Sequence, residues 1–326
     1  MTVLVTGAAG FIGFHVARAL LDRGKAVVGL DNLDPYYDVS LKKARISLLE
    51  GQVGFVFKRI DITDVAAMDA LVAERPDITH AVHLAAQAGV RYSLENPYAY
   101  IKANVEGHLV VLETLRKLPR FEHLVFASSS SVYGGNEKLP FSVTDSVDNP
   151  LSLYAATKKS AELISRAYSH LHGLPQSGLR FFTVYGPWGR PDMAAFLFAR
   201  KIVAGESVPV FNHGDMRRDF TYIDDVAEGV LASLARPPAR EADEPPFRLY
   251  NLGNHRSEPL ARFIAILEKA LGRKAKLEKL PMQPGDVRET YADITESERD
   301  FGFRPKTAID EGIPRFVEWF RDFYGV

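Results

Sequence analysis

Short apolar runs alternate with longer amphipathic segments along the first half of the chain. The runs are rich in β-branched and aromatic residues, as buried strands are, and the segments between them repeat apolar positions at helical spacing. The expected strands are 3–6, 26–30, 53–58, 81–84, 123–127 and 177–184, and the expected helices are 11–23, 39–49, 65–73, 97–118 and 152–172. This alternation predicts right-handed crossovers and a parallel sheet with helices on both faces.

The rhythm changes after Tyr185. The stretch GPWGRPDM at 186–193 is typical of a loop, 194–204 of a helix, and the proline-rich, charged stretch 236–248 of a surface loop. Later apolar segments are shorter and mixed, and the chain has no internal repeat. We therefore expect an α/β fold, in which a Rossmann-type doubly wound parallel sheet carries a smaller C-terminal substrate-binding lobe.

Composition narrows the function classes. Of the 326 residues, 46% are apolar and 25% charged, and 40 basic side chains nearly balance 41 acidic ones. This balance favours neither nucleic acid nor an anionic membrane as a partner. The absence of cysteine excludes a disulfide, a thiolate zinc site and a cysteine nucleophile, and the histidines lack metal-ligand spacing, so no metal site is expected. Because no secretory signal or long apolar segment is present, we expect a cytoplasmic protein.

A glycine-rich turn joins the first expected strand to its helix. In TGAAGFIG, Gly7, Gly10 and Gly13 permit a tight turn whose backbone N–H groups approach a pyrophosphate at the helix N-terminus. Asp31 ends the second strand, where a carboxylate binds both ribose hydroxyls and repels a further phosphate, which favours NAD over NADP. Asp61 ends the third strand and is expected near the adenine. The alternative is a simple glycine turn with two helix N-caps. The expected cofactor contacts are Gly7, Gly10, Phe11, Ile12, Gly13, Asp31, Asn32, Asp61, Ile62, Leu84, Ala85 and Ala86, together with Tyr154 and Lys158.

Hydroxyl groups gather after the fifth expected strand. In ASSSSVYGG, four serines follow one another, although serine suits neither a helix interior nor a buried strand because its hydroxyl competes for backbone hydrogen bonds. In YAATK, Tyr154 and Lys158 lie four residues apart and therefore on one helix face, where an ammonium lowers the pKa of a phenol. Separately, these stretches could be a turn and a surface pair. Together with the glycine turn, they indicate a dinucleotide site with a tyrosine base.

Nearly the whole chain resembles the extended short-chain dehydrogenase/reductases that act on nucleotide sugars, and within that group the UDP-glucuronate 4-epimerases. The stretches that carry the resemblance are LVTGAAGFIGFHVARALL, DNLDPYYDVSLKKAR, HLAAQAGVRYSLENP, ASSSSVYG, SLYAATKKSAE, LRFFTVYGPWGRPDMA and RRDFTYIDDV. The resemblance implies an NAD-binding Rossmann domain over 1–180, to which a segment at about 215–255 returns, and a mainly nucleotide-sugar-binding lobe over 181–326. It also implies a homodimer in which the helices near 97–118 and 152–172 pair as a four-helix bundle.

The resemblance also assigns roles to the hydroxyl cluster and the helix that follows it. Ser129 would hydrogen-bond the 4-hydroxyl of the sugar, Tyr154 would act as the base, and Lys158 would bind the nicotinamide ribose and tune Tyr154. Ser130 and Ser131 stand where sugar 4,6-dehydratases have an Asp-Glu pair. Serine cannot do the same acid–base work at neutral pH, so these two serines favour oxidation without elimination of water.

Substrate contacts are implied at four further positions. Thr183 and Arg190 match the residues that face the sugar carboxylate in glucuronate epimerases, and a guanidinium fork suits a carboxylate. Arg218 matches the arginine that binds the diphosphate, with a surface or salt-bridge role as the alternative for both arginines. Gln283 stands where some sugar epimerases have an arginine, which weakens its role as a second phosphate contact. His83 is expected to be a buried structural residue.

These expectations form one functional hypothesis. The chain would epimerise UDP-glucuronate at carbon 4 to UDP-galacturonate through a transient 4-keto sugar that rotates before it is reduced again, while NAD stays bound. A UDP-glucuronate decarboxylase and another UDP-hexose 4-epimerase are the alternatives within the same chemistry. A binding module without activity is disfavoured, because Ser129, Tyr154 and Lys158 are all present.

Overall fold

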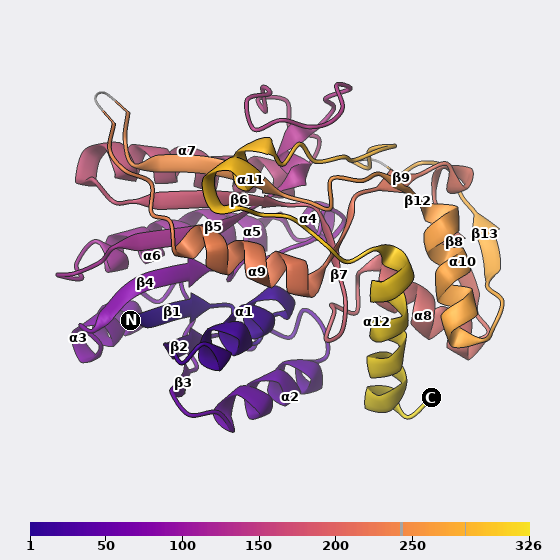
Figure 1. Cartoon of the computed structure of the whole chain (residues 1–326), viewed down its shortest axis with the longest axis horizontal. Coiled ribbons are helices and arrows are strands. Elements are labelled where there is room, and N and C mark those ends of the chain that lie inside the picture. Colours follow the sequence, from indigo (N-terminus) through magenta and orange to yellow (C-terminus); the bar gives the residue numbers. More distant parts are fainter. Residues whose placement is uncertain (242–243, 284) are drawn as a thin grey trace.

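The computed structural model describes residues 1–241, 244–283 and 285–326. Its centre is a parallel sheet with the strand order β11-β6-β5-β4-β1-β2-β3, flanked by helices on both faces (Figure 1). The strands are β1 (Thr2–Thr6), β2 (Ala26–Leu30), β3 (Phe55–Lys58), β4 (Ile78–His83), β5 (His123–Ser129), β6 (Gln176–Phe181) and β11 (Phe247–Leu252). The α/β fold with a doubly wound Rossmann-type sheet is therefore confirmed.

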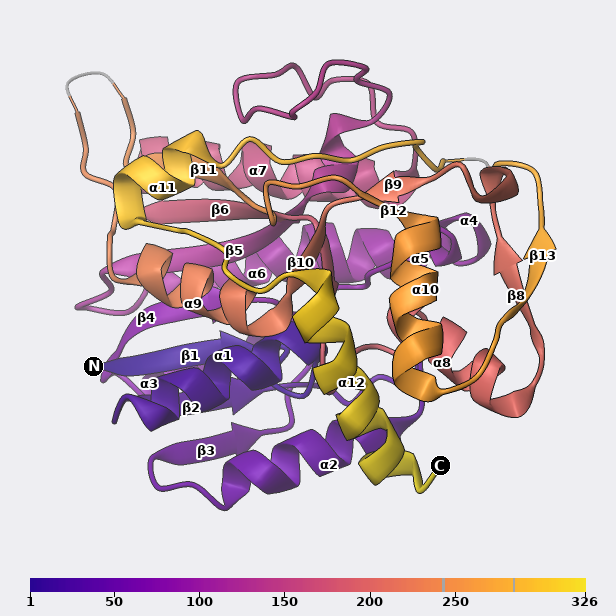
Figure 2. The same cartoon turned by 45° about the vertical axis from the view of Figure 1, so that its right-hand side comes forward.

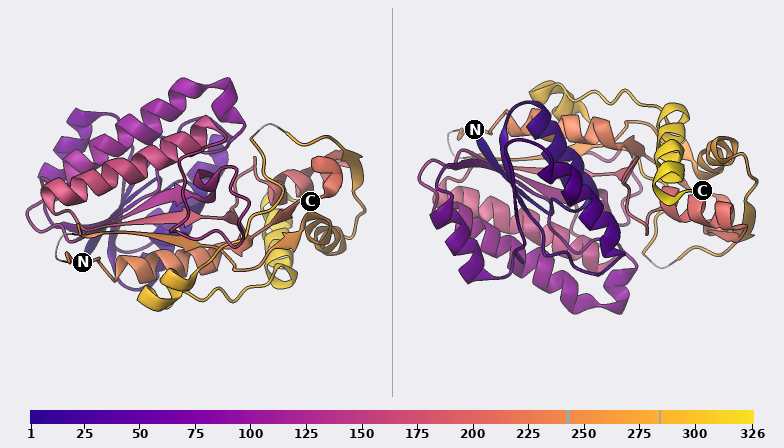
Figure 3. Two further views of the ribbon diagram at one scale, coloured as in Figure 1. Left: turned by 90° about the horizontal axis from the view of Figure 1, so that it is seen from above. Right: turned by 90° about the horizontal axis from the view of Figure 1, so that it is seen from below.

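The two helical layers are visible when the sheet is seen from its edge (Figure 3). One layer contains α1 (Phe11–Asp22), α2 (Val39–Glu50), α9 (Ile223–Leu234) and α11 (Thr295–Phe301), and the other contains α3 (Val65–Glu74), α6 (Gly107–Leu115) and α7 (Leu153–His172). β1 is buried along its whole length, as a central strand covered on both faces must be. The crossovers from β1 and β3 run in opposite directions, so β1 and β4 flank the switch point at which ligands bind in such sheets.

A smaller lobe lies beside the carboxyl ends of these strands (Figure 2). In it, α10 (Leu260–Leu271) packs against both α8 (Ala194–Ala204) and α12 (Ile309–Tyr324). Three short strand pairs complete this region: β7 (Thr183–Tyr185) with β10 (Phe220–Tyr222), β8 (Ser207–Val210) with β13 (Lys276–Lys279), and β9 (Arg217–Arg218) with β12 (Glu258–Pro259). No helix among the described residues is long and apolar enough to span a membrane.

Two expected elements differ from those observed. The single helix expected at 97–118 is instead a short helix, α5 (Pro97–Tyr100), a π-helical stretch (Ile101–Glu106), and then α6. The buried Asn104 explains the widened turn, because its side chain accepts a hydrogen bond from the Gln87 backbone N–H (2.8 Å) and donates one to the Gln87 carbonyl (2.9 Å). The strand expected at 177–184 divides at Phe182 into β6, which joins the main sheet, and β7, which pairs with β10.

The sequence also missed or misplaced smaller features. A one-turn helix, α4 (Tyr92–Glu95), follows the loop after β4, and β4 itself begins three residues earlier than expected, at Ile78. The expected surface loop at 236–248 includes residues 242 and 243, which lie outside the described residues. The segment at about 215–255 contributes α9, which packs against α1, and β11 at the edge of the main sheet.

Candidate active site

A cavity of about 940 Å³ opens where the carboxyl ends of the central strands face the smaller lobe. Among the residues that line it are all but one of the expected contacts: Gly7, Gly10, Phe11, Ile12, Gly13, Asp31, Asn32, Asp61, Ile62, Leu84, Ala85, Ala86, Ser129, Ser130, Ser131, Tyr154, Lys158, Thr183, Arg190 and Arg218. The exception is Gln283, which does not line the cavity. Segments from eight parts of the chain thus share one cavity, although the roles of their residues have to be argued from local geometry.

The glycine turn brings the N-terminus of α1 to the cavity wall. Gly7 has a φ of +72°, and a Cβ placed on it would lie 2.8 Å from the backbone nitrogen of Ala85. A Cβ on Gly13 would lie 2.0 Å from the Gly7 carbonyl oxygen. Helix α1 begins at Gly10 without a side-chain cap, so its first N–H groups are available to an anion. Only glycine fits these positions, and the resulting cradle suits a pyrophosphate.

Two oriented carboxylates stand beyond this turn. Asp31 accepts hydrogen bonds from the backbone N–H groups of Ala9 (3.2 Å) and Leu33 (2.8 Å), and its Oδ1 lies 3.5 Å from the Lys42 ammonium. Asp61 accepts bonds from Asn32 and Thr63. Burial raises the pKa of Asp61, but these hydrogen bonds outweigh it and leave the pKa lowered. Hydrogen bonds therefore orient both side chains where the hydroxyls and base of a nucleotide would lie.

Tyr154 and Lys158 face the cavity from the first turns of α7. Ser152 caps this helix by accepting a hydrogen bond from the Ala155 N–H (3.2 Å). Lys158 donates to the Ala127 carbonyl (3.0 Å), and burial lowers its pKa to about 8, against the opposing charge of Glu162. Its ammonium is thus tied to the end of β5.

The pKa of Tyr154 differs from the sequence expectation. The spacing predicted that Lys158 would lower the pKa of Tyr154, but burial raises it, and the opposing influences are a hydrogen bond with Ser129 and the charge of Arg190. The hydrogen bond that the Lys158 ammonium makes is to the Ala127 carbonyl. In the protein without ligands, Tyr154 is therefore a protonated phenol at neutral pH.

The four serines divide into two groups. Ser128 points away from solvent and donates to Glu162 (2.6 Å), which forms a buried pair with Arg180 through two further bonds of 2.8 and 2.9 Å. All four serines border the cavity, but the Ser128 hydroxyl is turned to Glu162. Among the other three, the Ser129 hydroxyl accepts the Ser131 N–H (3.2 Å) and donates to its hydroxyl (3.2 Å). One serine therefore anchors the strand to α7, and three supply neutral hydroxyls to the cavity.

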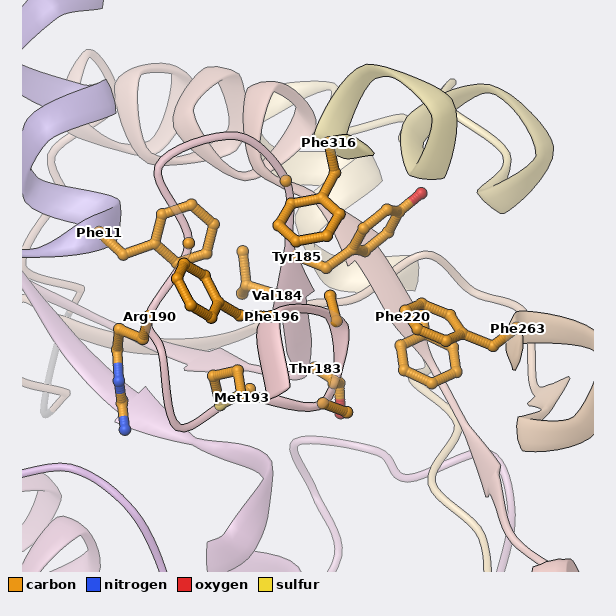
Figure 4. Close-up of a pocket in the computed structure, with 14 residues that line it drawn as sticks. Phe11, Thr183, Val184, Tyr185, Arg190, Met193, Phe196, Phe220, Phe263 and Phe316 are labelled. Atoms are coloured by element: carbon orange, nitrogen blue, oxygen red, sulfur yellow. The ribbon is translucent and has the colours of Figure 1, made fainter. Parts of the chain in front are cut away.

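The opposite wall carries the expected substrate arginines. Arg218 donates to the backbone carbonyls of Arg217 (2.8 Å) and Arg288 (3.1 Å), and burial lowers its pKa. Arg190 is instead paired with Asp192 through bonds of 3.0 and 2.5 Å. Figure 4 shows Arg190 extending away from the aromatic side chains that lie behind its loop. Arg190 was expected to face a sugar carboxylate, with a salt bridge as the alternative; in this structure Asp192 pairs with one edge of its guanidinium.

A buried arginine links the two walls. Arg45 is fully buried and donates to the Ala9 carbonyl in the glycine turn (2.8 Å) and to the Trp188 carbonyl in the Arg190 loop (2.6 Å). It also bonds the hydroxyl of Tyr37 (2.8 Å). Sequence spacing gave no sign of this role, because the three partners lie in three separate segments.

Other cavity residues were also missed. They include Tyr36, Lys42, Gln87, Arg91, Asp192, Phe211 and Asp286. Arg91 lies 4.5 Å from the ring centroid of Phe211 and 3.6 Å from a carboxylate oxygen of Asp286. One sequence feature could have identified them: charged and aromatic residues cluster in the loops that follow the strands, and binding residues often lie on such loops. His83 does not line the cavity; it is buried, and its Nδ1 lies 2.7 Å from the hydroxyl of Thr6.

Comparison with known proteins identifies the family. Residues 3–253 match the model of the NAD dependent epimerase/dehydratase family. The chain belongs to this family. The family description names NAD as the cofactor. Two features of this chain fit NAD: the glycine turn has room for a pyrophosphate, and the Asp31 carboxylate can accept hydrogen bonds from ribose hydroxyls.

Individual relatives and solved structures within the family are named for the UDP-sugars on which they act or with which they were solved. A probable UDP-glucuronate 4-epimerase of Rhizobium meliloti is 47% identical over 99% of this chain and 98% of its own length. The UDP-glucuronic acid 4-epimerase of Bacillus cereus, solved with UDP-glucuronic acid and NAD, superimposes with a TM-score of 0.88 at 32% identity, over 99% of this chain and all of that one. The UDP-glucose 4-epimerase of Thermotoga maritima, solved with UDP-glucose, also reaches 0.88, at 29% identity over the same shares. Fold similarity alone therefore does not separate the two sugars.

Proposed function

We propose that this protein is a UDP-glucuronate 4-epimerase that uses NAD and interconverts UDP-glucuronate and UDP-galacturonate. One observation carries the proposal: Tyr154, Lys158 and the hydroxyls of Ser129 to Ser131 share a cavity with Arg190, and positions 130 and 131 carry serines rather than acidic residues. The first group suits oxidation of an alcohol, and the arginine suits a sugar acid. The names of the relatives, at 47% identity over nearly the full length, point to the same substrate.

The residues at the end of β5 and the start of α7 would carry the chemistry. Bound NAD would supply first the acceptor and then the donor of the hydride at carbon 4. Tyr154 would first have to lose its own proton, and as the phenolate it would then take the proton of the 4-hydroxyl, which Ser129 orients through its hydrogen bond. Lys158 holds the nicotinamide ribose and, when protonated, favours the phenolate. After the 4-keto sugar turns, the hydride would return to carbon 4 and Tyr154 would return the proton, so the reaction is redox-neutral overall.

The serines account for the absence of elimination. Removal of water from a 4-keto sugar requires an acid and a base beside carbon 5 and carbon 6. Ser130 and Ser131 supply neither at neutral pH, and the nearby Glu162 is committed to Arg180 and Ser128. The oxidised sugar would therefore be reduced again rather than dehydrated.

Decarboxylation is the main competing outcome. The 4-keto sugar acid is a β-keto acid, which loses carbon dioxide readily unless its carboxylate is held. We propose that Thr183 and Arg190 hold this carboxylate, that Arg218 binds the diphosphate, and that the sugar-binding lobe is formed mainly by 181–326. Gln283 does not line the cavity, so a phosphate contact at this position lacks support.

We also propose a homodimer. Tyr98 (84% exposed) in α5, Ile101 (47%) after it and Leu163 (56%) in α7 present apolar surface on neighbouring helices. A second copy would cover this face as a four-helix bundle. Light scattering at micromolar concentration should give the mass of two chains, whereas the mass of one chain would contradict the dimer.

Product analysis tests the proposed function. Purified protein is mixed with UDP-glucuronate, and separately with UDP-glucose, and the products are resolved by NMR. We expect UDP-galacturonate from the first with little UDP-pentose, and slower conversion of the second. A dominant UDP-pentose product with release of carbon dioxide would assign the protein to the decarboxylases, and faster epimerisation of UDP-glucose would assign it to the neutral UDP-hexose epimerases.

A further inference from the structure

Three loops that border the cavity meet at Arg190. Asp192 belongs to the same loop, Tyr36 to the loop after β2, and Gly89 to the loop after β4. The Tyr36 hydroxyl donates to Asp192 Oδ2 (3.2 Å), the oxygen that also accepts Arg190 Nη2. Gly89 has a φ of +104°, and a Cβ on it would lie 3.2 Å from the Tyr36 oxygen and 3.7 Å from Arg190 Nη2. The cluster is therefore closely covered by backbone.

Asp192 accepts hydrogen bonds from the edge of the Arg190 guanidinium that is formed by Nε and Nη2. These two N–H donors form the fork that binds a carboxylate bidentately. The charge of Arg190 lowers the pKa of Asp192 although burial raises it, so the pair is ionised. Within the described residues, Nη1 of Arg190 makes no hydrogen bond to a protein group. An arriving sugar carboxylate must therefore use this remaining edge or displace Asp192.

We propose that Asp192 sets the strength with which the cavity holds a carboxylated sugar, by competing with the substrate carboxylate for Arg190. This inference rests on the proposed function. When the sugar carboxylate leaves Arg190, Asp192 pairs with it again, so the guanidinium is not left unpaired in a partly dehydrated cavity. Interactions that hold one sugar orientation too tightly would slow the turn between loss and return of hydride, because they stabilise the ground state. Competition from Asp192 limits that binding.

The test is the difference in affinity between sugars with and without a carboxylate. Binding of UDP-glucuronate, UDP-glucose and UDP to NAD-loaded protein is measured by calorimetry in the Tyr154→Phe background, where turnover is slow. Asp192→Asn removes the competing charge. We expect UDP-glucuronate to bind up to about fivefold more tightly, the upper end for a partly exposed ion pair, while UDP-glucose and UDP change by less than about 1.5-fold.

Steady-state kinetics provide a second readout. In the otherwise wild-type protein, Asp192→Asn should lower both KM and kcat for UDP-glucuronate, because ground-state binding is gained without a gain in the transition state. A variant that was only misfolded would lose kcat without tighter binding. Asp192→Glu keeps a carboxylate and should lie closest to the wild type. Asp192→Ala should act in the same direction as Asp192→Asn, so the test does not depend on one variant.

The chain contains a matched control outside the cavity. Asp300 also accepts two bonds from a neighbouring arginine, Arg299 (2.6 and 3.0 Å), and one from a tyrosine, Tyr250 (3.0 Å). Asp300→Asn should leave the affinities for all three nucleotides unchanged. An unchanged preference in both Asp192→Asn and Asp192→Ala, or weaker binding of UDP-glucuronate alone, would overturn the proposal. Failure of the wild type to epimerise UDP-glucuronate would instead refute the proposed function, whatever Asp192 does.

Discussion

The two walls of the cavity are built in different ways. The wall at the glycine turn uses the backbone: Gly7 and Gly13 are required because any Cβ would collide with neighbouring main chain. The wall at Arg190 and Arg218 uses long side chains whose positions depend on partners such as Asp192. A backbone site leaves a glycine pattern in a short stretch of sequence, whereas a side-chain site is defined by contacts between distant segments. Substitutions should therefore affect the two walls by different mechanisms.

The largest effect is expected at the buried pair of Glu162 and Arg180, which lies outside both walls. Glu162→Gln would leave Arg180 buried without its counterion, and both side chains of this pair are almost fully inaccessible. The free energy of unfolding should fall by about 3–5 kcal/mol. Glu74→Gln is the control, because Glu74 also accepts two bonds, from Lys58, but is exposed and should cost less than about 1 kcal/mol. Equal losses in urea denaturation would contradict a structural role for the buried pair.

The next largest effect is expected on turnover, without a change in the binding of NAD or UDP. Tyr154→Phe should lower turnover of UDP-glucuronate by at least about 10²-fold, because a general acid–base group is lost. The ring remains, so NAD content and the affinity for UDP should stay close to wild type. Tyr98→Phe serves as a control, since this tyrosine is 84% exposed. Near-normal turnover in Tyr154→Phe would remove this residue from the mechanism.

Addition of a single methyl group should affect the cofactor wall alone. Gly7→Ala combines a left-handed backbone with a contact of 2.8 Å to the Ala85 nitrogen, so the loop after β4 has to move. We expect NAD released by acid from the purified variant to drop by about tenfold or more, with UDP binding preserved. Gly24→Ala has nearly the same φ, +69°, but no neighbour within 4 Å, and should retain NAD. Parallel loss in both variants would show that backbone strain, and not the close approach, is responsible.

Removal of a side chain should affect the sugar wall alone. Arg190→Ala deletes the cation and leaves Asp192 without it, so the preference for UDP-glucuronate over UDP-glucose in kcat/KM should fall by about three- to tenfold. The NAD content should not change. If the preference is unchanged, Arg190 does not contact the carboxylate.

The same contrast explains what the sequence could and could not predict. The parallel sheet and the glycine turn follow from local patterns, because buried strands and left-handed glycines are local requirements. The division of 97–118 depends on Asn104 reaching Gln87, and the split after Phe181 depends on pairing between β7 and β10. Arg190 was identified only through resemblance to a family. A salt bridge was the alternative for Arg190, but the sequence did not identify Asp192 as its partner or the bond from Tyr36 to Asp192, because spacing does not show which groups a fold brings together.

The fate of the hydrogen at carbon 4 tests the central claim most directly. UDP-glucuronate that carries deuterium at carbon 4 is incubated with purified protein without added NAD, and the product is examined by NMR and mass spectrometry. The account predicts UDP-galacturonate that retains the deuterium at carbon 4, because the same carbon is oxidised and reduced again in one cavity. Loss of the deuterium, or a UDP-pentose product with carbon dioxide, would contradict it.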